Sequence, residues 1–96
     1  MILEFTNTNF VLDGGYYYSP EYKQDTIDTL MTVAVQLGVV GTFSMQESID
    51  GINWLDVPDS TVICSLTGLQ TFIDCHFELR YRIKTDQIVT KAQIAI

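Results

Sequence analysis

Alternating apolar and polar positions run through most of this chain and predict β-strands. The clearest example is the segment 77–84, in which four apolar residues are separated by charged residues. Successive side chains of a strand point to opposite faces, so this alternation predicts a half-buried antiparallel strand. The apolar positions are Phe77, Leu79, Tyr81 and Ile83, and the charged positions are Glu78, Arg80, Arg82 and Lys84.

Residues 42–57 predict a β-hairpin. From 42 to 49 the residues alternate, and then the chain meets Asp50-Gly51. An Asp-Gly pair between two strands is the strongest short hairpin signal, because a type I′ turn needs positive φ at both central positions. The returning arm is predicted over 52–57, ending at Pro58, which has no amide hydrogen for a central ladder. The face predicted for the first arm carries Phe43, Met45, Glu47 and Ile49.

Two longer segments are also predicted to be strands. The segment 26–37 fits a helical spacing as well, but its many β-branched residues favour a strand. After a polar turn at 85–87, the segment 88–96 alternates again, with Lys91 and Gln93 on its polar face. The opposite face is predicted to carry Ile88, Thr90, Ala92, Ile94 and Ile96.

The N-terminal quarter predicts shorter elements. Segments 2–6 and 9–12 are short strand candidates, followed by a turn at 13–15 and a long loop or edge excursion to Gln24. Seven or eight short strands, with turn signals every 8–12 residues, predict an all-β fold. We therefore expect a single antiparallel β-sandwich over 1–96, jelly-roll-like. Its residues 1–12 would be either an edge strand of that sandwich or a strand that docks on a neighbouring sheet.

Composition and charge narrow the class of protein. With 47% hydrophobic residues the chain can bury a core, and it contains no apolar run long enough to span a membrane. The first residues do not resemble a secretion signal, so we expect the product to stay inside the producing cell. The net charge of −7 argues against nucleic acid and anionic membranes as partners. Arg80, Arg82 and Lys84 nevertheless form a local basic stripe, either a solvated strand face or a contact site.

Catalytic and metal-binding sets are not evident. Cys64, Cys75 and the single histidine, His76, cannot supply a zinc site, and no cofactor is expected. His76 adjoins Cys75, and neighbours on a strand point to opposite faces, so the two would not form a catalytic dyad. We therefore predict a non-enzymatic protein. Free thiols are the default, although a Cys64–Cys75 disulfide would form if 61–66 and 71–79 paired as a hairpin.

Two motifs resemble the discoidin-like (F5/8 type C) jelly-roll sandwiches and their phage and bacterial relatives. In that family a strand ends in S-x-D-G-x-x-W, which here is the segment 48–54, and a later strand reads R-Y-x-R-I, which the segment Arg80-Tyr81-Arg82-Ile83 resembles. The resemblance covers about 42–85 and implies the fold but no binding residue. The residues that carry it are Asp50, Gly51, Trp54, Arg80, Tyr81 and Arg82. We expect Trp54 to cap one end of the core and Tyr81 and Ile83 to pack from the opposite sheet.

Short acidic sandwiches of this kind look most like phage virion proteins, such as capsid decoration proteins, head fibres or tail components. The first hypothesis is therefore a structural protein on the capsid exterior, made in the host cytoplasm, that binds and reinforces the major capsid protein or other virion subunits or self-associates. Tyrosine is enriched at interfaces, although these tyrosines could instead pack on the sandwich. The candidate interface residues are Tyr16, Tyr17, Tyr18, Tyr22, Phe5 and Phe10.

The alternative hypothesis is a small carbohydrate-binding module that mediates adhesion to a host glycan. An exposed tryptophan can stack on a sugar ring, and Trp54 would do so together with the tyrosines if it were not part of the core.

Overall fold

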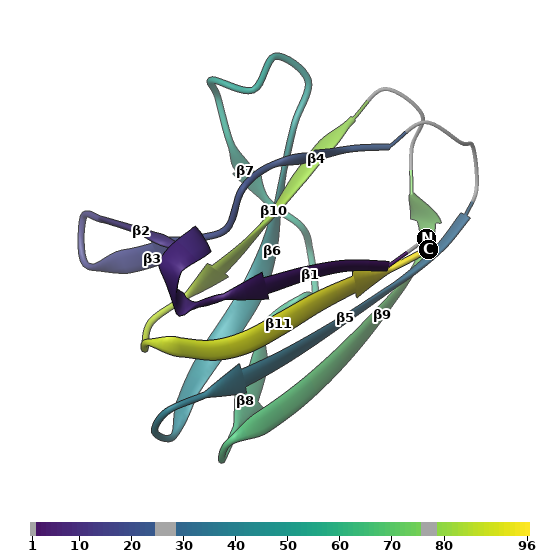
Figure 1. The fold of residues 1–96 in the computed structure, drawn as a ribbon. Helices are drawn as coiled ribbons and strands as arrows, with labels where there is room; N and C mark the ends of the chain where they lie inside the picture. Colours follow the sequence, from purple (N-terminus) through teal and green to yellow (C-terminus); the bar gives the residue numbers. More distant parts are fainter. Residues whose placement is uncertain (1, 25–28, 76–78) are drawn as a thin grey trace.

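The computed structural model describes residues 2–24, 29–75 and 79–96, and they form an antiparallel β-sandwich, as predicted (Figure 1). One sheet, here called the β5 sheet, has the order β1 (Ile2–Thr6), β11 (Val89–Ala95), β5 (Thr29–Leu37) and β9 (Thr67–Cys75). The other, the β10 sheet, has the order β2 (Val11–Asp13), β3 (Tyr16–Tyr18), β10 (Arg80–Thr85), β6 (Gly41–Ser48) and β7 (Leu55–Asp56). In addition, β4 (Tyr22–Lys23) pairs with β10, and β8 (Val62–Cys64) pairs with β6. A single 3₁₀ turn, η1 (Asn7–Asn9), links β1 to β2.

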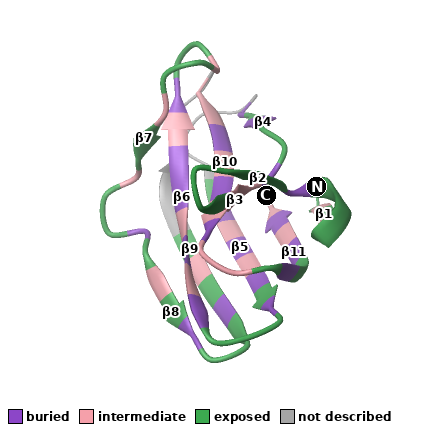
Figure 2. Cartoon of the chain, turned by 90° about the vertical axis from the view of Figure 1, so that its left-hand side faces the viewer, coloured by how far each residue is buried: buried purple, intermediate pink, exposed green. Residues whose placement is uncertain are grey.

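The core lies between the two sheets and is built from alternate residues of the central strands. Figure 2 shows this alternation as buried bands separated by intermediate ones along β6 and β10, and by intermediate and exposed ones along β5. The predicted inward faces of β6 and β10 are confirmed for Phe43, Met45, Tyr81 and Ile83, which are all buried, but not for Ile49, which lies beyond the end of β6 and is 84% exposed. The other buried apolar residues are Phe10, Tyr22, Met31, Val33, Val35, Leu37, Cys64, Val89, Ala92 and Ile94.

The predicted face of the last strand is only partly right. Ala92 and Ile94 are buried, but Val89 is buried in place of Ile88 and Thr90, which are exposed. The pairing of β11 with β5 shifts register between Val89 and Lys91. Such a bulge inserts one residue and reverses the parity of the side chains that precede it.

The predicted Asp50-Gly51 type I′ turn is wrong. Gly51 has a φ of 77°, whereas Asp50 keeps a negative φ. The chain leaves β6 at Ser48 and pairs again only at β7, so a loop replaces most of the predicted returning arm. A two-residue turn with positive φ at both positions occurs instead at Gly14-Gly15, where φ is 59° and 88° and β2 meets β3.

Three other expectations are corrected or narrowed. Tyr81 and Ile83 were expected in the sheet opposite Trp54, but β10 pairs directly with β6, the strand that leads into the loop 49–54, here called the Asp50 loop. The hairpin that would have joined Cys64 to Cys75 is not formed, since β8 pairs with β6 and β9 pairs with β5, and Cys64 is a buried free thiol. Segments 25–28 and 76–78, including His76, lie outside the described residues.

The N-terminal segment forms part of this chain's own sandwich. In β1, Ile2 to Thr6 pair with Ala95 to Lys91 of β11, so β1 is an edge strand of the β5 sheet. This is the first of the two alternatives for residues 1–12. Among the described residues, no helix has the length and apolar character needed to span a membrane.

Candidate functional site

The outward face of β10 carries the basic stripe that the sequence predicted. In this strand Tyr81 and Ile83 point into the core, so Arg80, Arg82 and Lys84 point away from it. β10 is central in its sheet, with β3 and β4 on one side and β6 on the other. The stripe therefore faces side chains from both neighbouring strands.

Arg82 lies between two aromatic rings. Its guanidinium carbon is 4.0 Å from the centroid of the Tyr18 ring and 4.3 Å from that of the Trp54 ring. Tyr18 comes from β3, where it pairs with Lys84, and Trp54 comes from the segment that leads into β7. A guanidinium over an aromatic face is attracted by the ring quadrupole, by about 0.5–2 kcal/mol for each such contact. The three side chains form a layered stack across the sheet.

Polar side chains from β6 and β7 fix the edge of this stack. The Nε of Arg82 donates a 2.8 Å hydrogen bond to Oε1 of Gln46, and Nε2 of Gln46 donates a 3.0 Å bond to Oδ1 of Asp56. The amide of Gln46 is thereby oriented on both sides, and the residue is only 7% exposed. Partial burial lowers the pKa of the Arg82 guanidinium from its ordinary value, but arginine remains protonated at any physiological pH.

A second cation–aromatic pair lies beside the first. Nζ of Lys84 is 4.3 Å from the centroid of the Tyr16 ring and 3.9 Å from Oδ1 of Asp56. Next to this pair is a polar hollow of about 170 Å³. Its lining comprises Tyr16, Thr42, Ser44, Asp56, Thr61, Lys84, Thr85 and Asp86. The outer face of the β10 sheet thus combines aromatic rings, cations, hydroxyls and carboxylates around a shallow depression.

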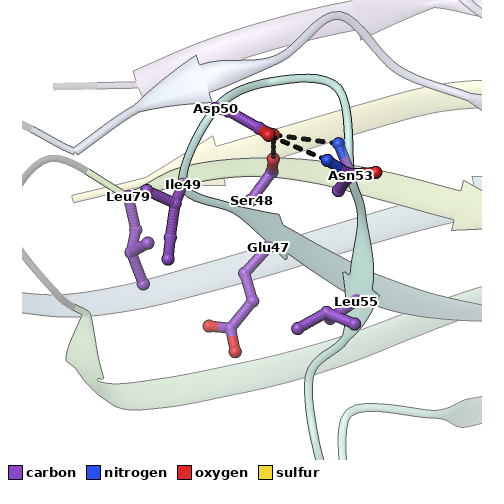
Figure 3. A pocket seen from close by; sticks show the side chains of 7 residues that line it. All are labelled: Glu47, Ser48, Ile49, Asp50, Asn53, Leu55 and Leu79. Carbon is purple, nitrogen blue, oxygen red and sulfur yellow. Dashed lines mark hydrogen bonds between the residues drawn. The ribbon is translucent and has the colours of Figure 1, made fainter.

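Hydrogen bonds of the Asp50 carboxylate fix the conformation of the Asp50 loop, which leads to Trp54. Oδ1 of Asp50 accepts hydrogen bonds from the backbone amides of Ile52 and Asn53, both at 2.9 Å, and from the Ser48 hydroxyl at 3.0 Å. Oδ2 accepts a further bond from Nδ2 of Asn53 at 2.9 Å (Figure 3). These bonds hold the pKa of the Asp50 carboxyl far below its usual range. The predicted motif residue therefore shapes the loop that ends at Trp54.

The same loop borders an apolar pocket of about 290 Å³ that Trp54 does not line. Figure 3 shows the side chains of Ile49, Leu55 and Leu79 around it, with the Glu47 carboxylate among them. No group of three or more His, Cys, Asp or Glu side chains in the described part of the chain is arranged to hold a metal ion.

The predicted interface residues fall into two groups. Tyr16 and Tyr18 lie on the outer face of the β10 sheet, where each stacks on a cation. The expectation of an exposed surface is wrong for Phe10 and Tyr22, which are 9% and 8% exposed and belong to the core. Phe5 and Tyr17 are half-buried and pack against that core, and the Phe5 ring meets Phe10 edge to face at 6.4 Å. Phe5, Tyr17 and Tyr22 lie at inward positions of their strands, whereas Phe10 follows the 3₁₀ turn η1 and packs into the core from there.

Trp54 departs from its expected place in the core. It is half-buried and stacks on Arg82 at the outer face of the sheet.

Sequence reasoning also missed Gln46 and Asp56, which complete the site. Their positions depend on the register of β6 with β10 and with β7, in which Gln46 pairs with Arg82 and with Asp56. The alternation of each strand predicts its outward face, but no local signal predicts which outward residues become neighbours.

Comparison with known proteins gives a structural likeness and no family. No family model matches the chain, and no curated protein matches it. A similar solved structure is the C-terminal carbohydrate-binding module, a CBM6, of LamC, a marine laminarinase from Zobellia galactanivorans. The TM-score is 0.60 and the sequence identity 8%, and each chain is covered over 100% of its length. A second structure, Drosophila melanogaster CENP-C bound to CAL1, has a TM-score of 0.36 at 14% identity, with 91% of this chain and 73% of that chain covered.

The likeness to the CBM6 module concerns the fold. It agrees with the jelly-roll-like β-sandwich that the sequence predicted and with the discoidin-like resemblance at the level of architecture.

Proposed function

We propose that this chain is a non-enzymatic carbohydrate-binding module that binds a glycan on the outer face of the β10 sheet. The observation that carries the proposal is the stack of Tyr18, Arg82 and Trp54 beside the hydrogen-bonded side chains of Gln46 and Asp56. The proposed adhesion of the chain to a host glycan would use this face.

This combination suits the chemistry of a sugar. A pyranose ring has apolar C–H faces that pack on aromatic rings, and hydroxyl groups that need donors and acceptors around its rim. Tyr18 and Trp54 are half-buried, so each residue keeps part of its surface accessible to solvent. Gln46, Asp56 and Lys84 place an amide, a carboxylate and an ammonium next to them. A shallow face of this kind fits an extended polysaccharide chain.

The fold supports the proposal independently. The sandwich is similar over its full length to a carbohydrate-binding module of a laminarinase, and that neighbour is a binding domain of a larger enzyme. At 8% identity this likeness lends support through the architecture alone, so the residues of the site carry the argument.

Trp54 makes the proposal straightforward to test. It is the single tryptophan of the chain, so a ligand on this face should change the intrinsic fluorescence. Titration with a panel of soluble polysaccharides, namely a neutral β-glucan, xylan, polygalacturonate and a sulfated galactan, should give a saturable change with at least one of them. Calorimetry on Trp54→Ala and Tyr18→Ala should then show weakened binding.

A matched control lies on the opposite face of the sandwich. Leu69 of β9 is an exposed apolar residue of the β5 sheet, so Leu69→Ala truncates a surface side chain away from the proposed site. It should bind like the unaltered chain. Saturable binding that is equally weakened by Leu69→Ala, or absence of binding to every glycan of the panel, would overturn the proposal.

A second candidate is a structural role on a phage virion, with the chain docked on the capsid exterior through a virion subunit. One observation favours it: Val11 and Leu12 of the β2–β3 hairpin are 65% and 60% exposed, and Tyr16 is 41% exposed. Figure 1 shows this hairpin extending beyond the body of the sandwich. Density-gradient purification of particles, with quantification of the chain against the major capsid protein, tests this role. Many copies per particle would support it and absence would exclude it.

A further inference from the structure

We infer that the glycan bound by this face is acidic, and that Arg82 receives its carboxylate or sulfate group with Lys84 as the second cation. This inference rests on the proposed function, since it names the class of glycan for the same site.

The distribution of charge is the first argument. The chain has 12 acidic and only 5 basic residues, yet Arg80, Arg82 and Lys84 all lie on the outer face of β10. Lys23 of β4 pairs with Arg80 in register, so four of the five cations belong to two adjacent strands. Exposed charges more than about 8–10 Å apart are largely screened at physiological ionic strength. An anion at this face therefore experiences the local cations more strongly than the net charge of −7.

The geometry of Arg82 is the second argument. Its Nε is bonded to Gln46, and the rings of Tyr18 and Trp54 lie on the guanidinium, which holds its plane. Within the described residues, neither terminal nitrogen has a hydrogen-bond partner and no carboxylate lies within ion-pair distance of Arg82. A planar arginine with its terminal donors open is suited to a planar carboxylate, which it binds through two parallel hydrogen bonds.

Two acidic groups near this face, Asp56 and Glu21, are already engaged with other partners. Asp56 accepts from Gln46 and lies near Lys84, while Glu21 pairs with Arg80 at 3.1 Å. Arg80 is thereby neutralised, and the 3.9 Å contact with Asp56 partly neutralises Lys84, so Arg82 is left as the main cation that a ligand can satisfy. Lys84 is two residues further along the same face, roughly 7 Å away along the strand. Two cations spaced along the strand suit a chain of repeated anionic sugar units better than a single anion.

The test compares glycans that differ only in charge. Polygalacturonate and its fully methyl-esterified form share one backbone, and the ester removes the carboxylate charge. We expect the esterified form to bind at least roughly tenfold more weakly, the effect of losing one charge-assisted bidentate contact. Dextran sulfate against dextran makes the same comparison for sulfate and tells which acidic group is preferred. Binding of the acidic forms should also weaken as sodium chloride is raised.

Variants tie the effect to Arg82. Arg82→Gln should weaken polygalacturonate binding by roughly tenfold or more. Arg82→Lys should recover only part of the lost affinity, since lysine keeps the positive charge but lacks the planar pair of donors that binds a carboxylate through two hydrogen bonds. Lys84→Gln leaves the stack intact and should also weaken binding, so the test does not depend on the folding of one variant. Lys91→Gln makes the same change of charge on the β5 sheet and should bind like the unaltered chain.

The outcomes separate the two proposals. Equal binding of the acidic and the esterified forms would overturn the acidic-glycan inference and leave the carbohydrate-binding function standing. An equal loss in Lys91→Gln would also overturn it, since general electrostatic attraction would then explain the binding. Failure of every neutral and acidic glycan to bind would overturn both.

Discussion

The guanidinium of Arg82 stacks on the indole of Trp54, with 4.3 Å between the guanidinium carbon and the ring centroid. Arg82 lies in β10, whereas Trp54 lies at the end of the Asp50 loop, just before β7, so the conformation of this loop brings Trp54 to the outer face. This contact links the structural motif of the loop to the proposed ligand-binding face.

Trp54→Ala should therefore lower stability as well as glycan binding. Removing the ring takes away one cation–aromatic contact and exposes the stem of Arg82, and we expect a loss of about 0.5–2 kcal/mol in the free energy of unfolding. Trp54→Phe keeps an aromatic face and should lose less than half as much. Urea denaturation followed by far-ultraviolet circular dichroism measures both. Equal losses in the two variants would contradict the role given to the aromatic face.

Much of the fold was predictable because strand alternation depends only on a period of two. Phe43 and Met45 on β6, and Tyr81 and Ile83 on β10, are buried where that period places them. The prediction failed where a local event changes the period. At Val89 a bulge shifts the register of β11 and reverses which residues point inward.

The site was predictable only in part, for a different reason. The basic stripe on β10 and the aromatic candidates Tyr16, Tyr18 and Trp54 were visible in the sequence, but their juxtaposition was not. Arg82 meets Gln46 through the pairing of β10 with β6, a contact 36 positions apart in the chain. The Asp50 carboxylate accepts hydrogen bonds from the backbone amides of Ile52 and Asn53. These side-chain bonds stabilise a longer loop, so the Asp50-Gly51 pair does not form a two-residue type I′ turn here.

Stability should depend on pH through Asp50. Its pKa in the folded chain lies below the usual value of about 3.9, because four hydrogen bonds favour the charged form. A depressed folded pKa contributes stability above the unfolded pKa, and that contribution is lost as pH falls through about 4 toward the folded value. We expect Asp50→Ala to have a lower Tm than the unaltered chain at pH 7, with the difference narrowing below about pH 4. Ser65→Ala removes no carboxyl group, and its Tm difference should stay constant over this pH range. Failure of the Asp50→Ala difference to narrow would contradict the assignment.

Gly68 should not tolerate a side chain. A Cβ built on Gly68 would lie 2.7 Å from Cε1 of Phe43 and 2.9 Å from Cβ of Cys64, both buried in the core. We expect Gly68→Ala to lower the free energy of unfolding by about 1–3 kcal/mol, as overpacking does in closely packed interiors. Gly38→Ala is the control, since the nearest atom to its added Cβ would be 3.8 Å away. Chemical denaturation of the two variants side by side makes the comparison, and equal stabilities would contradict the close packing of Gly68 against Phe43 and Cys64.

Ser60 should stabilise the fold through its hydrogen bond with the backbone amide of Met45. Its hydroxyl accepts a 3.1 Å hydrogen bond from the Met45 amide and lies 3.3 Å from the Met45 carbonyl, and the residue is 1% exposed. The Met45 carbonyl also accepts from the Val57 amide at 2.9 Å, so it keeps a partner without Ser60, whereas the Met45 amide loses its bond to the hydroxyl. A buried donor left unsatisfied costs about 1–3 kcal/mol, so Ser60→Ala should destabilise the chain by that amount. Ser65→Ala, at an exposed position, should change stability by less than about 0.5 kcal/mol. Hydrogen exchange at the Met45 amide gives a local check, because Ser60→Ala should speed exchange there more than at the neighbouring amides of β6.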